Sequence, residues 1–361
     1  MRGPIISVPL LLALFSIAGA QTPPSPQLQS RPNATKAPPG GTERQLTIDV
    51  QVTDHSGAPV RGLQQQDFTL LDDNQPLNIT SFRAVDNKNA SADDPVEMFL
   101  VIDAVNTGFQ TVTYERAQVR QFLLRNNGHL DFPASFVVLT DNGTKIQNGS
   151  SRDGNAMVAV YDQYETGLRS IARSAGFYGA AERFDVSLKA LNSLAAYLKT
   201  RPGRKLVIWF SPGWPLLSGP GIELSRKNEE QIFAGIVNAS TQLREARVTV
   251  YAIDPLGVAD SGGLRTFYYK EFLKGVTAPS HAQAGNLGLQ VLAVQTGGLV
   301  LNSSNDVAEE LAKCASDGDA FYVLSFNAVP ADKPDEYHSL AVKVDKPGVN
   351  VRTRTGYYAQ P

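Results

Sequence analysis

The hydrophobic pattern of this chain changes its period twice, and that change limits the folds available to it. Apolar and polar side chains alternate along Leu46–Val52 and again along Leu340–Val344 and Val349–Thr355. Between these segments, Met98–Ile102 is apolar on both faces. Alternation is typical of half-buried antiparallel strands, whereas continuous apolar runs are typical of parallel strands covered by helices. The sequence therefore predicts antiparallel β structure near both ends and a parallel sheet between them.

Helical patterns separate the apolar runs in the middle of the chain. Leu188, Leu191, Leu194 and Leu198 lie three or four residues apart, which places them on one face of a helix. The further apolar runs are Phe136–Leu139, Leu206–Phe210, Val248–Ile253 and Leu299–Leu301. Strands that alternate with helices predict right-handed crossovers. The expected fold class is therefore α/β, with a doubly wound, mostly parallel sheet and helices on both faces.

Two β segments flank the expected α/β domain, which spans residues 93–318. Residues 45–92 and 319–361 hold about 48 and 43 residues, together close to the ~100 residues of one β-sandwich. We therefore expect one antiparallel β-sandwich built from both segments, with the α/β domain inserted between its halves. The alternative is two separate β extensions of the α/β domain.

The N-terminus has the pattern of an export signal. Residues 1–20 carry Arg2, the apolar stretch Ile5–Ile17 and the small-residue sequence Ala18-Gly19-Ala20, which is typical of a cleavage site. A retained membrane anchor is the alternative reading. Residues 21–44 are rich in proline and predict an extended linker. The mature protein is expected in the periplasm or outside the cell, with no membrane span.

Composition and charge argue against several kinds of partner and bond. The formal net charge of −2 gives no electrostatic reason to expect a nucleic acid or an anionic membrane as partner. The one cysteine, Cys314, excludes an intrachain disulfide and continues an apolar helix face, so we expect it in the core. We expect Asp72 and Asp73 to lie in a turn that is exposed to solvent.

Two strand ends carry a resemblance to a known family. The first apolar strand ends in Val101–Thr107 and the fourth in Trp209–Pro215. These ends resemble the D-x-S-x-S and T-D-G motifs of von Willebrand factor A domains. The whole mature chain resembles the exported VWFA-related acidobacterial domain proteins, through V-x-V-T-D-x-x-G-x-P-V-x-G-L-x-x-x-D-F within Thr47–Phe82 and the tail Arg354–Tyr358.

The resemblance implies a metal-ion-dependent adhesion site, from which this sequence departs. In the family, Mg²⁺ is held by an Asp, two Ser, a Thr and a second Asp, and a partner's carboxylate takes the open position. Val105 replaces the first Ser, and Ser211-Pro212-Gly213 replaces T-D-G. The candidate metal ligands that remain are Asp103, Asn106, Thr107, Asp185 and Ser211. We expect a degenerate site with weak Mg²⁺ binding or none, in which Asp103 orders its own loop. A retained Mg²⁺ site is the alternative.

Apolar and aromatic residues near the same edge are candidate partner contacts. They are Trp214, Leu216 and Leu217 in the loop after the fourth strand, and Tyr268 and Tyr269 in the long connection 255–286. Exposed aromatic side chains dominate many protein interfaces. The alternative is that the loop packs onto its own domain.

These features predict a non-enzymatic, adhesion-type module that binds a protein or cell-surface ligand. This last step depends on analogy with the fold. One alternative is a hydrolase that uses the polar strand ends Asp103, Asp141, Ser211 and Asp254. Another is a structural component of the cell envelope.

Overall fold

The computed structural model describes residues 45–87, 94–164, 176–217, 219, 221–256 and 269–361. The expected export signal over 1–20, the linker over 21–44 and Tyr268 lie outside the described residues. Within them, every helix is too short or too polar to cross a bilayer.

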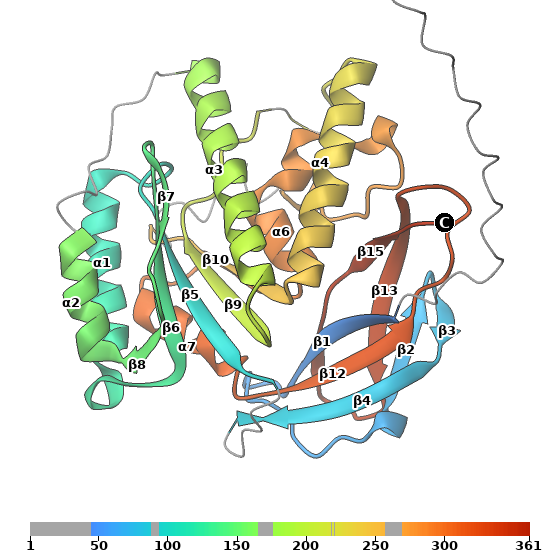
Figure 1. Ribbon diagram of the computed structural model, residues 1–361, viewed down its shortest axis with the longest axis horizontal. Coiled ribbons are helices and arrows are strands. Elements are labelled where there is room, and N and C mark those ends of the chain that lie inside the picture. The colour runs from blue at the N-terminus through green and yellow to red at the C-terminus, as the bar shows by residue number, and fades with distance from the viewer. Residues whose placement is uncertain (1–44, 88–93, 165–175, 218, 220, 257–268) are drawn as a thin grey trace, which may run out of the picture. The chain divides into compact units, whose positions relative to one another are not determined.

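A seven-stranded sheet forms the middle of the chain (Figure 1). Its main path runs β11-β10-β9-β5-β6-β7, and β8 also pairs with β6. The parallel strands are β5 (Val96–Asp103), β6 (His129–Thr140), β9 (Arg204–Phe210), β10 (Val248–Ile253) and β11 (Val300–Leu301). The antiparallel strands are β7 (Gly143–Ile146) and β8 (Ser151–Asp153). Every residue of β5, β9 and β10 is buried, which confirms the mostly parallel sheet expected from the apolar runs.

Helices cover both faces of this sheet because successive side chains of a strand point to opposite faces. Met98 and Leu100 of β5 join one apolar cluster, whereas Phe99 and Val101 join another. The first cluster is covered by α1 (Phe109–Leu123), α2 (Gly154–Tyr164) and α7 (Val307–Ser316). The second is covered by α3 (Gly176–Lys199), α4 (Arg226–Glu245) and α6 (Leu289–Gln295). Cys314 is fully buried in the first cluster, as expected.

Two antiparallel four-stranded sheets combine strands from both ends of the described chain. One has the order β14-β1-β12-β4 and the other β15-β13-β2-β3. The N-terminal strands are β1 (Gln45–Thr53), β2 (Phe68–Asp72), β3 (Gln75–Leu77) and β4 (Ile79–Asp86). The C-terminal strands are β12 (Ala320–Asn327), β13 (Glu336–Val344), β14 (Asn350–Arg352) and β15 (Gly356–Ala359). One apolar cluster takes side chains from both sheets, so the two chain ends share a core.

Short 3-10 helices complete the described connections. They are η1 (Gln65–Asp67), η3 (Arg125–Gly128), η6 (Pro279–His281) and η7 (Ala284–Leu287).

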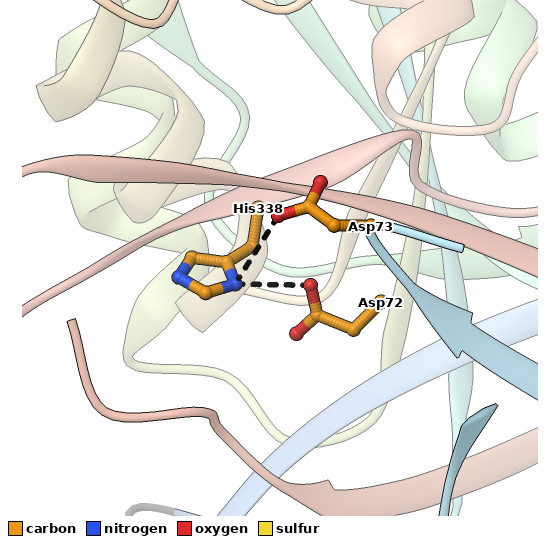
Figure 2. A group of neighbouring side chains, drawn as sticks. All are labelled: Asp72, Asp73 and His338. Carbon is orange, nitrogen blue, oxygen red and sulfur yellow. Dashed lines mark hydrogen bonds and ion pairs between the residues drawn. The ribbon is translucent and has the colours of Figure 1, made fainter. Parts of the chain in front are cut away.

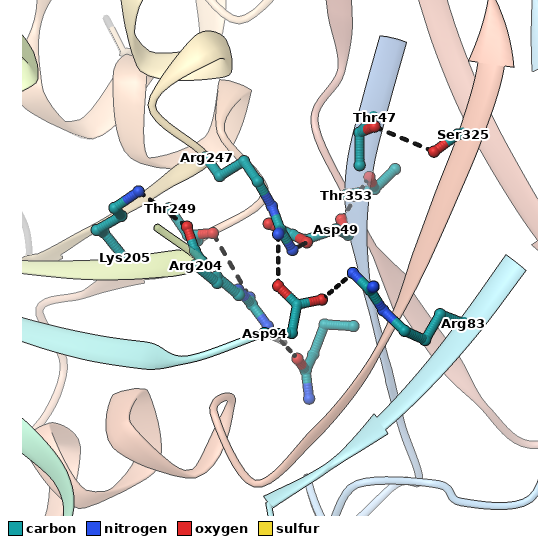
Figure 3. Close-up of polar contacts among 12 residues, drawn as sticks. Thr47, Asp49, Arg83, Asp94, Arg204, Lys205, Arg247, Thr249, Ser325 and Thr353 are labelled. Carbon is teal, nitrogen blue, oxygen red and sulfur yellow. Dashed lines mark hydrogen bonds and ion pairs between the residues drawn. The ribbon is translucent and has the colours of Figure 1, made fainter. Parts of the chain in front are cut away.

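Charged side chains join the antiparallel sheet of β1 to the central sheet (Figure 3). Asp94, just before β5, accepts hydrogen bonds from Arg83 of β4 and from Arg247, just before β10. Arg247 also donates to Asp49 of β1. Arg204, at the start of β9, is buried, and its guanidinium donates to the side chain of Gln51 on β1. This polar network fixes the first residues of three parallel strands against the antiparallel sheet.

Candidate functional site

The order of the parallel strands reverses between β5 and β9. β6 lies on the far side of β5, whereas β10 and β11 extend beyond β9. Ligands of open α/β sheets bind beyond the carboxyl ends of the strands at such a point. Asp103 is the last residue of β5, and Ser211 follows the last residue of β9. Because Ile102 pairs with Phe210, these two side chains lie at adjacent strand ends.

Asp103 is completely buried, and donors of its own domain surround it. Its Oδ1 accepts from the backbone N–H groups of Val105 at 3.0 Å and Asn106 at 2.9 Å. Its Oδ2 accepts from Nδ2 of Asn106 at 2.8 Å and from the indole Nε1 of Trp209 at 3.0 Å. Burial raises the pKa of Asp103 above its ordinary value, and the hydrogen bonds from Asn106 and Trp209 lower it. The carboxylate therefore orders the loop that follows β5.

Ser187, rather than Asp185, brings a polar group from α3 to this loop. Nδ2 of Asn106 also donates to Oγ of Ser187 at 2.8 Å, and that hydroxyl donates to the carbonyl of Arg183 at 2.8 Å. Asp185 is exposed, because residues two positions apart on a helix point in nearly opposite directions. The expectation that Asp185 belongs to the site is therefore wrong. Ser187 could have been found as the polar member of the apolar stripe that continues to Leu191.

The residues after β9 close over the strand end. Ser211 is fully buried, and its Oγ accepts from the backbone N–H of Gly213 at 3.2 Å. Gly213 has φ of +105°, and a Cβ there would lie 2.3 Å from Nε2 of Gln290. Glycine is therefore required at this turn, which brings the chain back against α6.

This donor set does not match the oxygen ligands that Mg²⁺ requires. The ion takes about six oxygen ligands in a near-octahedral arrangement. Both oxygens of Asp103 face N–H donors, and such donors repel a cation. Asn106 Oδ1 and Thr107 Oγ1 are buried without a hydrogen-bond partner among the described residues, and they are too few for such a shell. The Pro212 position offers no side-chain oxygen.

Glu115 is a buried carboxyl near this site that the sequence reasoning missed. It is fully buried on α1, and neither of its oxygens has a hydrogen-bond partner among the described residues. Burial raises the pKa of Glu115 well above its ordinary value, and the charge of Asp103 raises it further. Its spacing from Val112 and Val119 places it on the apolar face of α1, which is the signal that could have revealed it.

Trp214 is buried, so the expectation of an exposed aromatic anchor is wrong for this residue. Its side chain has no exposed surface, and its ring packs edge-on against Trp209 at 5.3 Å and Phe184 at 6.4 Å between centroids. Tyr269 is buried too, and its hydroxyl donates to the carbonyl of Trp214 at 3.4 Å. The physical reason is that the large apolar indole is more stable against the domain than in water.

Leu216 and Leu217 are half-buried against their own domain. The loop after β9 thus packs onto the domain, as the alternative reading had it. Of the five residues proposed to contact a partner, none of the four described ones is exposed.

A cavity of about 230 Å³ lies beyond the carboxyl ends of β9, β10 and β11. Its lining includes Pro212, Ala252, Leu273, Val294 and Leu301, together with the exposed Lys270. The buried Gln290 also lines the cavity, and its Oε1 has no hydrogen-bond partner among the described residues. An apolar cavity with a few polar groups at this edge is the usual form of a ligand site.

Of the four polar residues of the hydrolase alternative, Ser211 and Asp254 line this cavity, whereas Asp103 and Asp141 do not. Neither Asp103 nor Ser211 has exposed surface, and the side chain of Ser211 hydrogen-bonds to Asp103. Asp141 lies in the turn between β6 and β7, and Asp254 follows β10. Three strand spacings separate β6 from β10, which is about 14 Å.

A second polar cluster lies in the antiparallel sheet that contains β2 (Figure 2). Nδ1 of His338 lies 2.9 Å from Oδ1 of Asp72 and 3.8 Å from Oδ2 of Asp73. The hydroxyl of Tyr357 donates to Oδ2 of Asp72 at 2.7 Å. Asp72 is buried, so the expectation of a solvated turn is wrong for it. The side-chain oxygens of Asp72 and Asp73 and the ring nitrogen of His338 lie within 4.8 Å of one another, a spacing that a metal ion could use. Both oxygens of Asp72 are already hydrogen-bonded, to side chains of β13 and β15, and these bonds join three neighbouring strands.

Comparison with solved structures finds partial likenesses of low sequence identity. Proximal thread matrix protein 1 from the mussel byssus aligns with a TM-score of 0.35 and 13% identity, over 68% of this chain and 51% of that chain. The SpRpn10 VWA domain aligns with a TM-score of 0.30 and 12% identity, over 60% and 93%. The pilus adhesin SpaC from Lactobacillus rhamnosus GG aligns with a TM-score of 0.39 and 11% identity, over 85% and 48%.

This chain therefore spans about half the length of the mussel protein and of the adhesin. At these TM-scores the likenesses carry no functional argument. No protein-family model matches the sequence, and no curated protein matches it.

Proposed function

We propose that this chain is an exported, non-catalytic module that binds a protein or a cell-surface ligand without a metal ion. Its fold is von Willebrand factor A-like, inserted in an antiparallel β-sandwich. The observation that carries the proposal is the environment of Asp103, whose carboxylate accepts four N–H groups of its own domain. In the family that the sequence resembles, the corresponding carboxylate helps to hold the metal. Here it shapes the edge of the sheet instead.

The partner's contact surface is the cavity beyond β9, β10 and β11. Its apolar lining accepts one side chain of a partner, and Lys270 is the exposed side chain at that surface. Filling a well-formed apolar cavity is how a few residues supply most of an interface's binding energy. Tyr269 lines this cavity, and its hydroxyl donates to the carbonyl of the buried Trp214.

Catalysis is disfavoured by the same geometry. A nucleophile needs a base within hydrogen-bond reach and access to substrate. Ser211 has no exposed surface, and its hydroxyl is held by Asp103 and by the backbone N–H of Gly213. A non-catalytic binding module is the function that this combination of a covered polar centre and an adjacent apolar cavity supports best.

Photo-crosslinking tests this surface. A photoreactive amino acid replaces Lys270 in one variant and Lys343 in a matched control, since both side chains are exposed but Lys343 lies on β13 of the antiparallel sheet. Each variant is expressed in the native host and irradiated. We expect a crosslinked species from position 270 alone, unchanged by a chelator. The same species from position 343, or its loss with the chelator, would contradict the proposal.

A further inference from the structure

A small cavity lined by three arginines lies where the antiparallel sheet of β1 meets the central sheet. Its volume is about 20 Å³. Arg244 and Arg247 reach it from the end of α4, and Arg354 reaches it from the segment between β14 and β15. Thr47 and Asp49 of β1 and Thr249 of β10 also line it.

Arg354 is a buried cation with little compensation. Arg354 is only 7% exposed. Among the described residues, its guanidinium makes one hydrogen bond, of 3.4 Å, to the carbonyl of Ser240. A guanidinium has five N–H donors. Burial and the charge of Arg244 together lower the pKa of Arg354 to about 9, against the opposing charge of Asp49. A buried charge is costly unless an opposite charge accompanies it.

The acidic groups near this cavity are already used by Arg247. Asp49, the acid in the lining, accepts from the guanidinium of Arg247, and Asp94 accepts from the same group. Nε of Arg247 remains buried without a partner among the described residues. Burial and the charge of Arg247 together lower the pKa of Lys205, nearby in the polar network, to about 8. The surroundings of the cavity therefore have an excess of positive charge.

We propose that this cavity binds one small monatomic anion, such as chloride, held by Arg354 and by the Nε–H of Arg247. The volume suits one body of the size of a water molecule and is too small for phosphate or sulfate. Water would fill the space but leave the charge of Arg354 uncompensated. A bound anion joins β1, β10 and the segment before β15, and so locks the two parts of the fold together.

Thermal unfolding of the full chain in different sodium salts tests this site. At equal ionic strength, we expect the Tm to be about 3 °C higher in chloride or bromide than in gluconate, which is too large for the cavity. Arg354→Met removes this difference. Arg226→Met, on the same helix as Arg244 but with its side chain 90% exposed, keeps it. Equal Tm values in all three salts for the unsubstituted chain overturn the proposal.

Anomalous scattering from crystals of the unsubstituted protein grown in bromide covers the case in which Arg354→Met does not fold. We expect a bromide peak in the cavity beside Arg354. A water molecule there, with no anomalous signal, overturns the proposal.

Discussion

The indole N–H of Trp209 donates a 3.0 Å hydrogen bond to Oδ2 of Asp103, and this contact joins two neighbouring parallel strands at their carboxyl ends. Both side chains are fully buried or nearly so. In the family that the sequence resembles, the carboxyl end of this strand helps to hold a metal ion. Here the Asp103 side chain at that end is hydrogen-bonded to the core of the domain. The surface that we propose for a partner is the cavity beside it.

The contact between Trp209 and Asp103 makes a first prediction about stability. Trp209→Phe keeps an aromatic ring in the core but removes the N–H donor and part of the indole, so we expect a loss of about 1–3 kcal/mol in the free energy of unfolding. Urea unfolding of Trp209→Phe, Asp103→Asn and the double variant measures the coupling between them. Strictly additive losses would show that the hydrogen bond contributes nothing.

The second prediction concerns Trp214, which is buried in the core and is therefore expected to contribute to stability rather than to an interface. Trp214→Ala removes the ring that packs on Trp209 and Phe184, so we expect a loss of about 3–5 kcal/mol in urea unfolding. Leu217→Ala is the control, and its half-buried side chain should cost clearly less. A Trp214→Ala variant as stable as the parent would mean that the ring is exposed.

The cluster of Asp72, His338 and Tyr357 gives a third prediction. Asp72→Asn turns one of the two carboxylate oxygens into an NH2 donor that faces either His338 or Tyr357, so we expect a loss of about 1–3 kcal/mol in the free energy of unfolding. Asp73→Asn is the matched control, because the Asp73 side chain is 57% exposed. Chemical denaturation compares the two variants. Equal losses would show that Asp72 is as solvated as the sequence alone had indicated.

The fourth prediction concerns Glu310 on α7 and how the free energy of unfolding depends on pH. Burial and the charge of Asp254 raise the pKa of Glu310 to about 7. Between the ordinary glutamate pKa and pH 7 the folded state holds a proton that the unfolded state has lost, so this residue lowers stability as pH rises through that range. Glu310→Gln should therefore stabilise the protein at pH 8 by roughly 1–3 kcal/mol and much less at pH 4. A gain at pH 4 as large as at pH 8 would contradict this.

Local pattern was enough to predict the parallel sheet. Runs such as Met98–Ile102 are buried on both faces in the structure because helices cover both sides. The position of Asp103 at a strand end followed from the same run. By contrast, β1 pairs with β12, whose residues follow those of β1 by 272 to 282 positions, and no local pattern indicates such a partner.

The site was harder to predict because it depends on where helices begin and how loops fold back. α3 begins at Gly176, well before the apolar stripe that revealed it, so Asp185 lies within the helix and points to solvent. Ser187 and Glu115 are polar residues on apolar helix faces, and their spacing marks them as unusual but does not say which groups surround them. The burial of Trp214 depends on the turn at Gly213, which periodicity does not describe.

Isothermal titration of the folded protein with Mg²⁺ and Mn²⁺ tests the central claim, that the Asp103 site holds no metal. The titration is repeated with Asp103→Ala. We expect no heat of binding in the micromolar range for either protein, because N–H donors occupy both oxygens of the carboxylate. Micromolar binding to the unsubstituted protein that disappears in Asp103→Ala would contradict the account.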